Sequence, residues 1–187
     1  MSSKRNRLYI ISAPSGTGKS TVIGRLLELR KELVLSVSVT TRPPREGETD
    51  GLSYHFVTRE RFQEMIGRGE FLEYTQYAGE LYGTPKNPIF DYISRGKDIL
   101  LEIEVQGARQ VMAKEPGAVS IFIVPPDMRE LERRLRGRGT DSGEKLAYRL
   151  DRARQELREK AFYDHIVVNN EVDCAAREIL SIIDNTE

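Results

Sequence analysis

The feature that most constrains the fold is a short apolar run that leads into a glycine-rich loop and then into a helical pattern. Residues 8–12 read L-Y-I-I-S, typical of a buried strand, and residues 13–21 read A-P-S-G-T-G-K-S-T. From Lys19 to Arg30, apolar residues recur at the spacing of one helix face. A strand, such a loop and a helix in this order predict the start of an α/β fold with a parallel sheet.

Strand and helix patterns alternate through much of the remaining chain. Apolar runs predict further strands at 98–105, 119–124 and 166–168, the last of them as a core strand. Helical patterns follow these strands at 106–114, 127–136 and 173–183. This rhythm favours one α/β domain.

Two segments interrupt the rhythm. Between residues 36 and 91 there are polar turns and short strands, at Tyr54–Val57 and Phe71–Gln76, which indicate an insert into the core. The run G-R-G-T-D-S-G at 137–143 separates two charged helices and indicates a mobile cover. We therefore expect a single domain over 1–187, with a core of 1–35, 92–136 and 149–187, an insert at 36–91 and a lid at 137–148.

Composition excludes several classes of protein. Basic and acidic residues number 29 each, which disfavours binding of nucleic acid by bulk charge. The single cysteine, Cys174, cannot form an intrachain disulfide and fits a reducing compartment. No apolar run approaches the length of a membrane span, and none near the N-terminus resembles a signal peptide. We expect a soluble, cytoplasmic protein.

The loop at 13–21 fits a phosphate-binding P-loop except at its first position, where Ala13 replaces glycine. Glycines let backbone N–H groups turn inward onto phosphates, and the following helix adds its positive end. Lys19 can reach the β and γ phosphates, and the Ser20 hydroxyl can bind Mg²⁺. The alternative, a glycine-rich turn without a ligand, is disfavoured because strand, loop and helix stand in the required order.

A second anion site is indicated in the insert. Arg42 and Arg45 lie three residues apart, and Tyr54 follows with a hydroxyl, so the three can clamp a phosphate. A solvated basic turn is an equally good interpretation of these residues alone.

Six motifs in order resemble those of the guanylate kinase family. They are A-P-S-G-T-G-K-S-T (13–21), S-V-T-T-R-P-P-R-E-G-E (38–48), G-E-F-L-E-Y (69–74), L-Y-G-T (81–84), L-E-I-E-V-Q-G (101–107) and R-R-L-R-G-R-G-T (133–140). The resemblance runs from about residue 8 to the end. It implies a P-loop NTPase-type parallel sheet with helices on both faces, a small mixed α+β insert that binds a nucleoside monophosphate, and a short lid.

The resemblance also implies an activity. The family phosphorylates GMP, and we expect dGMP as well, to the diphosphate with ATP as donor and Mg²⁺ as cofactor. The expected partners are these small molecules, without nucleic acid or membrane, and the chain is expected to be a monomer or a homodimer.

The resemblance also implies a set of site residues. The family's ATP site corresponds to Ala13, Pro14, Ser15, Gly16, Thr17, Gly18, Lys19, Ser20, Thr21 and Asn169, with Ser20 on Mg²⁺. Its GMP site corresponds to Ser38, Arg42, Arg45, Tyr54, Glu73, Tyr82, Thr84, Glu102 and Glu104. Its catalytic cations correspond to Lys19, Arg42, Arg134, Arg138 and Arg149.

The sequence departs from the family pattern at two places. Ala13 replaces the first P-loop glycine, and Glu102 and Glu104 stand where the family often has aspartate. His55 and His165 are not needed as general bases, because phosphoryl transfer depends on positioning and charge neutralisation.

Two rival functions remain open at this point. Guanylate kinase-like modules of scaffold proteins bind peptides without catalysis, but they typically lack the P-loop lysine that this chain has. A kinase for another small phosphate ester would keep the P-loop but should lose the S-x-T-T-R motif or Glu73.

Overall fold

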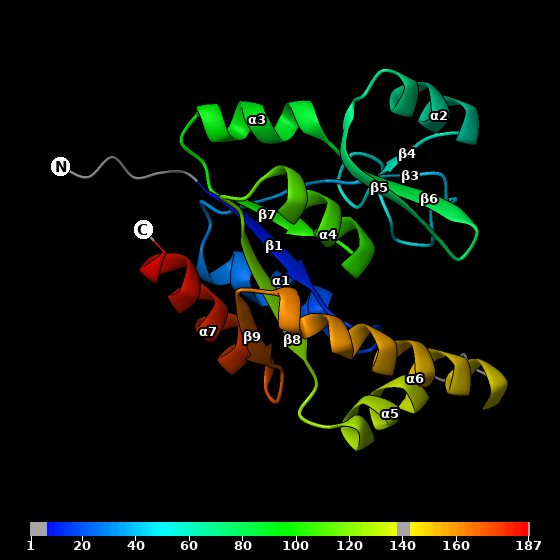
Figure 1. The fold of residues 1–187 in the computed structure, drawn as a ribbon, viewed down its shortest axis with the longest axis vertical. Coiled ribbons are helices and arrows are strands. Elements are labelled where there is room, and N and C mark those ends of the chain that lie inside the picture. The colour runs from blue at the N-terminus through cyan, green and yellow to red at the C-terminus, as the bar shows by residue number, and fades with distance from the viewer. Residues whose placement is uncertain (1–6, 138–142, 187) are drawn as a thin grey trace.

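The computed structural model describes residues 7–137 and 143–186, which form two sheets of different size (Figure 1). The large sheet is parallel in every described pairing, with β1 at its centre between β7 and β8. In spatial order its strands are β2 (Val34–Leu35), β7 (Ile99–Glu102), β1 (Leu8–Ser12), β8 (Val119–Val124) and β9 (His165–Val168). The predicted α/β fold is confirmed.

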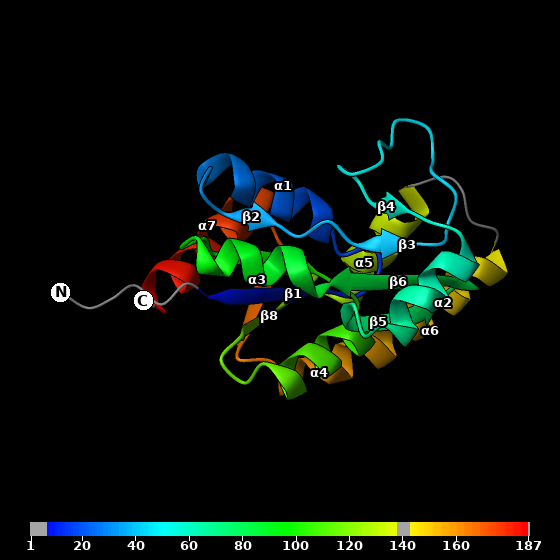
Figure 2. The same ribbon diagram turned by 90° about the horizontal axis from the view of Figure 1, so that it is seen from above.

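Helices cover both faces of the large sheet (Figure 2). Along β1, Tyr9 and Ile11 belong to the core shared with α1 (Lys19–Leu29) and α7 (Val172–Asn185). Leu8 and Ile10 belong to the core on the other face, with α3 (Lys86–Ser94) and α4 (Val105–Lys114). A strand buried on both faces reads as a continuous apolar run, which is why L-Y-I-I-S predicted it correctly.

The small sheet belongs to the insert. Its strands lie in the order β4 (His55–Phe56), β3 (Val39–Thr40), β6 (Glu80–Pro85) and β5 (Phe71–Tyr77), with parallel and antiparallel pairs. Helix α2 (Arg59–Gly67) covers it, and the Phe62 and Phe71 rings stack with centroids 4.5 Å apart. The insert therefore has an apolar core of its own.

Two helices flank the predicted lid. The apolar sides of α5 (Met128–Gly137) and α6 (Gly143–Arg158) pack together through Leu131, Leu135, Leu146 and Leu150. A short 3-10 turn, Glu159–Phe162, then leads to β9. The predicted lid at 137–148 lies partly outside the described residues, and its residues 143–148 form the first turns of α6.

Several boundaries differ from the sequence predictions. The strand predicted at 98–105 ends at Glu102, and Val105 already begins α4. The predicted end of the insert at residue 91 falls inside α3, whose Ile89 is buried in the core of the large sheet.

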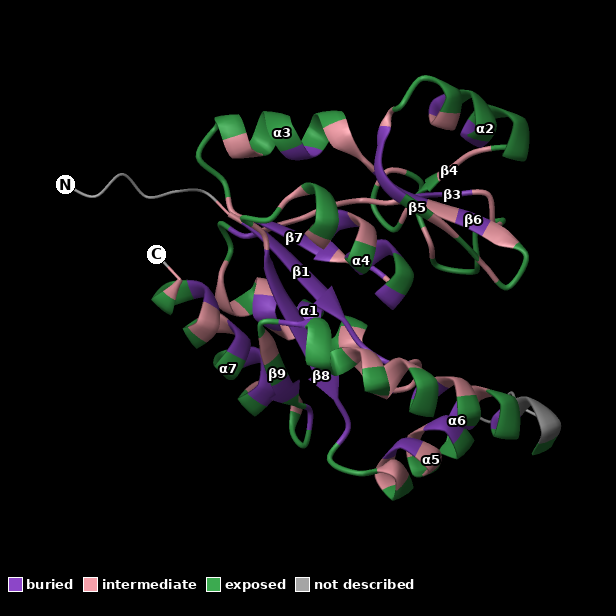
Figure 3. Cartoon of the chain, viewed as in Figure 1, coloured by how far each residue is buried: buried purple, intermediate pink, exposed green. Residues whose placement is uncertain are grey.

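The last strand, predicted as a core strand, is an edge strand. In β9 only Val167 is buried, whereas Ile166 is 45% exposed and Val168 is 47% exposed. Figure 3 shows the contrast with β1 and β8, which are buried throughout. Over residues 7–137 and 143–186, no helix has the length and apolar character needed to cross a membrane.

Candidate functional site

The glycine-rich loop lies at the carboxyl end of β1, between strand and helix as predicted. Gly16 and Gly18 have φ values of 89° and 90°, which L side chains rarely adopt. A Cβ atom at Gly18 would also lie 2.9 Å from Asn169 Nδ2. The loop follows the carboxyl end of β1, the central strand of the large sheet. Ligands of open parallel sheets bind beyond the carboxyl ends of the strands, so the loop lies where a ligand is expected.

Lys19 begins α1 and points along the loop towards the residues that follow β7. Its Nζ donates to the Ile103 carbonyl oxygen at 3.3 Å and lies 3.7 Å from Glu104 Oε1. Ser12 Oγ donates to the same carbonyl at 2.8 Å. The lysine is thus held in place, with its side chain 14% exposed, at the floor of the loop.

Ser20, the next residue, pairs with a carboxylate. Its Oγ donates to Glu102 Oε1 at 2.6 Å, so a hydroxyl and a carboxylate lie together beside the loop. Glu102 and Glu104 both line the cleft, but their direct partners are P-loop side chains. The resemblance had grouped both glutamates with the guanine contacts.

Arg134 and Asn169 bind the backbone of the loop at Thr17. The Thr17 carbonyl oxygen accepts hydrogen bonds from Asn169 Nδ2 at 2.7 Å and from Arg134 at 3.0 Å. Arg134 also donates to the Asn169 carbonyl at 3.0 Å and pairs with Glu130 at 2.7 Å. Asn169 is only 2% exposed, so in this conformation both residues support the loop backbone.

Helix α6 reaches the loop from another side. Arg149 donates to Ser15 Oγ at 2.9 Å, and the Ser15 N–H lies 3.4 Å from Glu156 Oε2. Burial raises the pKa of Glu156, and its hydrogen bond with Arg152 opposes that rise. Arg138, the remaining predicted cation, lies outside the described residues.

A second cationic group faces the loop from the insert. Arg42 pairs with Glu48 at 2.7 Å, and its guanidinium lies 5.5 Å from the centre of the Tyr54 ring. The hydrogen bond from Arg42 is the main cause of a lowered pKa at Glu48. The backbone N–H of Arg45 also donates to Glu48, at 2.7 Å, which leaves the exposed Arg45 side chain at the cleft rim.

Three tyrosines continue from this clamp. Tyr54 and Tyr82 meet edge-on with ring centroids 6.0 Å apart, and Tyr82 meets Tyr77 at 6.4 Å. Burial raises the pKa of Tyr54 and that of Tyr77, so these hydroxyls stay protonated as hydrogen-bond donors.

Glu73 is the most unusual group in the site. It lies on β5, is 3% exposed, and accepts a hydrogen bond from Thr84 Oγ1 of β6 at 2.6 Å. Burial raises the pKa of Glu73 to about 7, opposed by the Thr84 hydrogen bond and by Lys114. Space for this carboxylate depends on Gly107, where a Cβ would lie 2.3 Å from Glu73 Oε2.

One cleft of about 510 Å³ brings most of these residues together. It is lined by P-loop residues and by Ser38, Arg42, Arg45, Tyr54, Glu73, Tyr82, Glu102 and Glu104 from the predicted set. Thr84 joins them through Glu73, while Arg134, Arg149 and Asn169 contact the loop from outside the cleft lining.

Sequence reasoning missed part of the lining. Thr75 and Tyr77 alternate with Glu73 along β5 and share its face, so the period of a strand offered a signal for both. Glu48, Ser53 and Ile103 also line the cleft. Glu48 stood inside a quoted motif, but its pairing with Arg42 depends on how the loop folds.

A parallel sheet, a P-loop at its central strand and a facing arginine–tyrosine clamp define a P-loop kinase. Residues 5–186 match the family model described as guanylate kinase, and the chain belongs to the guanylate kinase family.

Individual relatives agree with this placement. The guanylate kinase of Synechocystis is 48% identical over 185 residues, which cover 99% of this chain and 97% of the relative. That of Lactococcus lactis is 48% identical over 181 residues, which cover 97% of this chain and 88% of the relative.

Solved structures extend the comparison. The crystal structure of guanylate kinase from Anaplasma phagocytophilum matches with a TM-score of 0.81 at 36% identity, over 97% of this chain and 86% of that one. A shikimate kinase from Bacteroides thetaiotaomicron, at 11% identity and a TM-score of 0.53 over 95% of this chain and 98% of that one, shares the fold alone.

Proposed function

We propose that this chain transfers the γ-phosphoryl group of ATP to GMP and releases GDP and ADP. The observation that carries the proposal is the buried carboxylate of Glu73, which lines the same cleft as the P-loop and the arginine clamp. That cleft can therefore hold a base and two phosphate groups. We propose dGMP as a second acceptor, because the residues assigned to the acceptor site bind its base and its phosphate and not its sugar.

The P-loop provides the donor site. Its inward N–H groups and the start of α1 bind the phosphates of ATP, and Lys19 neutralises charge on the transferred group. Arg149, which already contacts Ser15, supplies a second cation on this side. The contacts of Arg134 and Asn169 with the Thr17 carbonyl support their assignment to the ATP side. Arg138 is carried over from the resemblance as a further cation.

The insert provides the acceptor phosphate site. Arg42 and Arg45 bring positive charge, and the hydroxyls of Tyr54 and Tyr82 are donors to phosphate oxygens. Glu48 holds both arginines through the Arg42 side chain and the Arg45 backbone. The acceptor oxygen belongs to a phosphate, so no strong base is required. Neither His55 nor His165 lines the cleft.

Glu73 and Thr84 provide recognition of the base, with Ser38 beside them in the insert. Guanine presents two donors side by side, N1–H and the N2 amine. A single carboxylate can accept hydrogen bonds from both. Adenine has a lone pair at N1 and no N2 amine, so a buried carboxylate would stay unsatisfied against it. An unsatisfied buried charge costs more than a missing contact, so the choice of base is steep.

The oxygen donors beside the P-loop fit Mg²⁺. Ser20 Oγ and Glu102 Oε1 lie 2.6 Å apart, and Mg²⁺ in kinases takes one or two protein oxygens and otherwise phosphates and water. When bound there, the ion would supply positive charge that neutralises the donor phosphates. Among residues 7–137 and 143–186, no group of three or more His, Cys, Asp or Glu side chains forms an all-protein metal site.

We further propose that the protein works in the cytoplasm, as a monomer or homodimer. The chain's one cysteine, Cys174, is free and exposed on α7, which suits a reducing compartment.

An acceptor screen tests the proposed function. ADP release is measured with Mg·ATP and, in turn, GMP, dGMP, AMP, UMP and ribose phosphates. We expect high kcat/KM for GMP, turnover of dGMP, and rates for the others lower by orders of magnitude. Equal rates for AMP and GMP, or turnover of a sugar phosphate alone, would contradict the proposal.

A further inference from the structure

One row of side chains on α4 holds β5 of the insert against the core. Lys114 Nζ donates to the Leu72 carbonyl oxygen at 2.5 Å, and Gln110 Nε2 donates to the Tyr74 carbonyl at 2.8 Å. Gln106 Oε1 accepts from Thr75 Oγ1 at 3.0 Å. The three helix positions are spaced by four residues, so they lie on one face and follow the strand.

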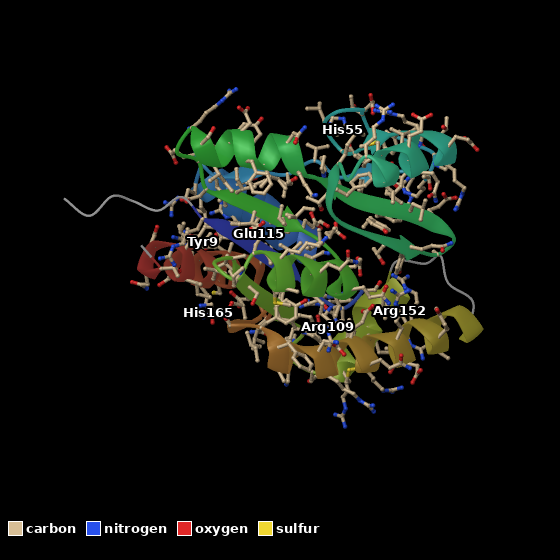
Figure 4. All side chains as sticks on the ribbon, turned by 45° about the horizontal axis from the view of Figure 1, so that its top comes forward. Tyr9, His55, Arg109, Glu115, Arg152 and His165 are labelled. Carbon is tan, nitrogen blue, oxygen red and sulfur yellow. The ribbon has the colours of Figure 1, made fainter. Side chains whose placement is uncertain are left out.

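The last residue of β5 is held by a different helix. The guanidinium of Arg152, on α6, lies 4.1 Å from the centre of the Tyr77 ring. Arg152 Nε donates to Glu156 Oε1 at 2.8 Å, and Glu156 Oε2 faces the N–H of Ser15 at 3.4 Å. Figure 4 labels Arg152 between α6 and the end of the β5–β6 hairpin. Arg152 therefore joins the insert to the P-loop.

The contacts continue on the other side of Tyr77. The Tyr77 ring contacts the Tyr82 ring, and the Tyr82 ring contacts the Tyr54 ring. The guanidinium of Arg42 lies over the Tyr54 ring. Direct contacts thus run from Ser15 in the donor site to the acceptor clamp, and Arg152 is the link between the two parts.

Arg152 itself does not line the cleft of the active site. It lines a second cavity of about 640 Å³ together with Glu156, Tyr148 and Arg109. Tyr77 lines both that cavity and the cleft of the active site. A change at Arg152 would therefore act on the substrates indirectly, through neighbours such as Tyr77 and Glu156.

We propose that Arg152 is a positioning residue that couples the P-loop to the acceptor clamp, so that ATP and GMP strengthen each other's binding. The inference rests on the proposed function. An arginine suits this role because its planar fork bonds Glu156 while its face rests on an aromatic ring. Loss of Arg152 would leave Glu156 half-buried without that partner and would free Tyr77 to turn.

The test measures binding of GMP by calorimetry with and without a non-hydrolysable ATP analogue and Mg²⁺. In the wild-type chain the analogue should lower the Kd of GMP. In Arg152→Met this ratio should fall about three- to tenfold, the range expected for losing a cation–π contact and its hydrogen bond. Unchanged melting temperature and an unchanged Kd for the analogue alone would exclude a merely structural effect.

Variants at Tyr77 provide an independent arm. Tyr77→Phe keeps the ring and should keep the coupling ratio, whereas Tyr77→Leu should lower it as much as Arg152→Met does. The double variant Tyr77→Leu/Arg152→Met should be no worse than either single one. Arg154→Met, at an exposed position of the same helix, is the matched control and should behave as wild type.

Three outcomes would overturn the inference: no coupling in the wild type, a preserved ratio in Arg152→Met, or equal effects of Tyr77→Phe and Tyr77→Leu. If the wild-type chain phosphorylates GMP in these cases, only the inference fails. A wild-type chain that does not phosphorylate GMP overturns the proposed function as well.

Discussion

The donor and acceptor sides of the cleft are built in different ways. The donor side is centred on one contiguous loop, residues 13–21, whose backbone at Gly16 and Gly18 adopts positive φ. The acceptor side collects Arg42, Glu73 and Tyr82 from segments far apart in the chain. Phosphate can be bound by a local backbone conformation, whereas reading a base needs side chains that a sheet brings together.

The two sides also differ in how their charges are satisfied. Lys19 already has partners in Glu104 and the Ile103 carbonyl oxygen. Glu73 is buried, with Thr84 as its hydrogen-bond donor and a pKa raised to about 7. The acceptor side thus holds a carboxylate that the right base would satisfy, and the predictions below test this contrast.

The largest effect is expected at Lys19. Lys19→Met removes a charge directed at the transferring phosphoryl group, so kcat should fall on the order of 10³-fold. The Kd of GMP should change little, because Lys19 belongs to the P-loop and not to the insert that holds Arg42 and Glu73. Lys31→Met, at an exposed position after α1, is the control. A near-normal kcat in Lys19→Met would contradict the assignment of residues 13–21 as a P-loop.

Glu73→Gln should have the next largest effect, on GMP alone. The amide keeps the shape of the side chain but replaces an acceptor with a donor. The fall in kcat/KM for GMP should correspond to a loss of about 2–4 kcal/mol of transition-state stabilisation. The KM for ATP should stay within twofold. Glu64→Gln on α2, where the side chain is 57% exposed, should leave both constants unchanged.

Gly107→Ala should disturb the same carboxylate indirectly. The added methyl would lie 2.3 Å from Glu73 Oε2 and must displace it, which we expect to cost about 2 kcal/mol, or roughly 30-fold, in kcat/KM for GMP. Gly24→Ala on α1 is the matched control, because a Cβ there meets nothing within 4 Å. Equal behaviour of the two variants would show that Glu73 moves aside freely.

A smaller effect is expected from pH. With a pKa of about 7 in the free protein, Glu73 becomes protonated as pH falls below 7 and can no longer accept both guanine donors. The KM for GMP should therefore rise about tenfold from pH 8 to pH 6. Because the GMP phosphate also titrates near pH 6, Glu73→Gln is the reference profile. Parallel profiles for the two proteins would contradict this role of Glu73.

The sequence predicted well those parts whose signal is local. β1, the P-loop and α1 form one continuous pattern, and the structure places them as expected. β9 was misjudged because I-V-V reads as a buried run, whereas its place at the sheet edge depends on the order of strands. α3 was not predicted, and it contains Pro88 within its first turn.

The site residues show the same difference between local and long-range signals. Glu73 could not be distinguished from a surface glutamate without the family motifs, because its burial depends on Gly107 and α4. Tyr77 shares the strand face of Glu73 but was missed, because the predicted strand ended at Gln76, one residue before it. The site residues assigned from motifs remain predictions about ligands that experiments must test.

The most direct test of base reading by Glu73 compares GMP with inosine monophosphate, which keeps N1–H but lacks the N2 amine. In the wild-type chain, kcat/KM should favour GMP by about 10- to 100-fold, the worth of one charge-assisted hydrogen bond. In Glu73→Gln this preference should shrink to a few-fold, while the KM for ATP stays constant. A preference for GMP that is unchanged in Glu73→Gln would contradict the account, because another group would then read the base.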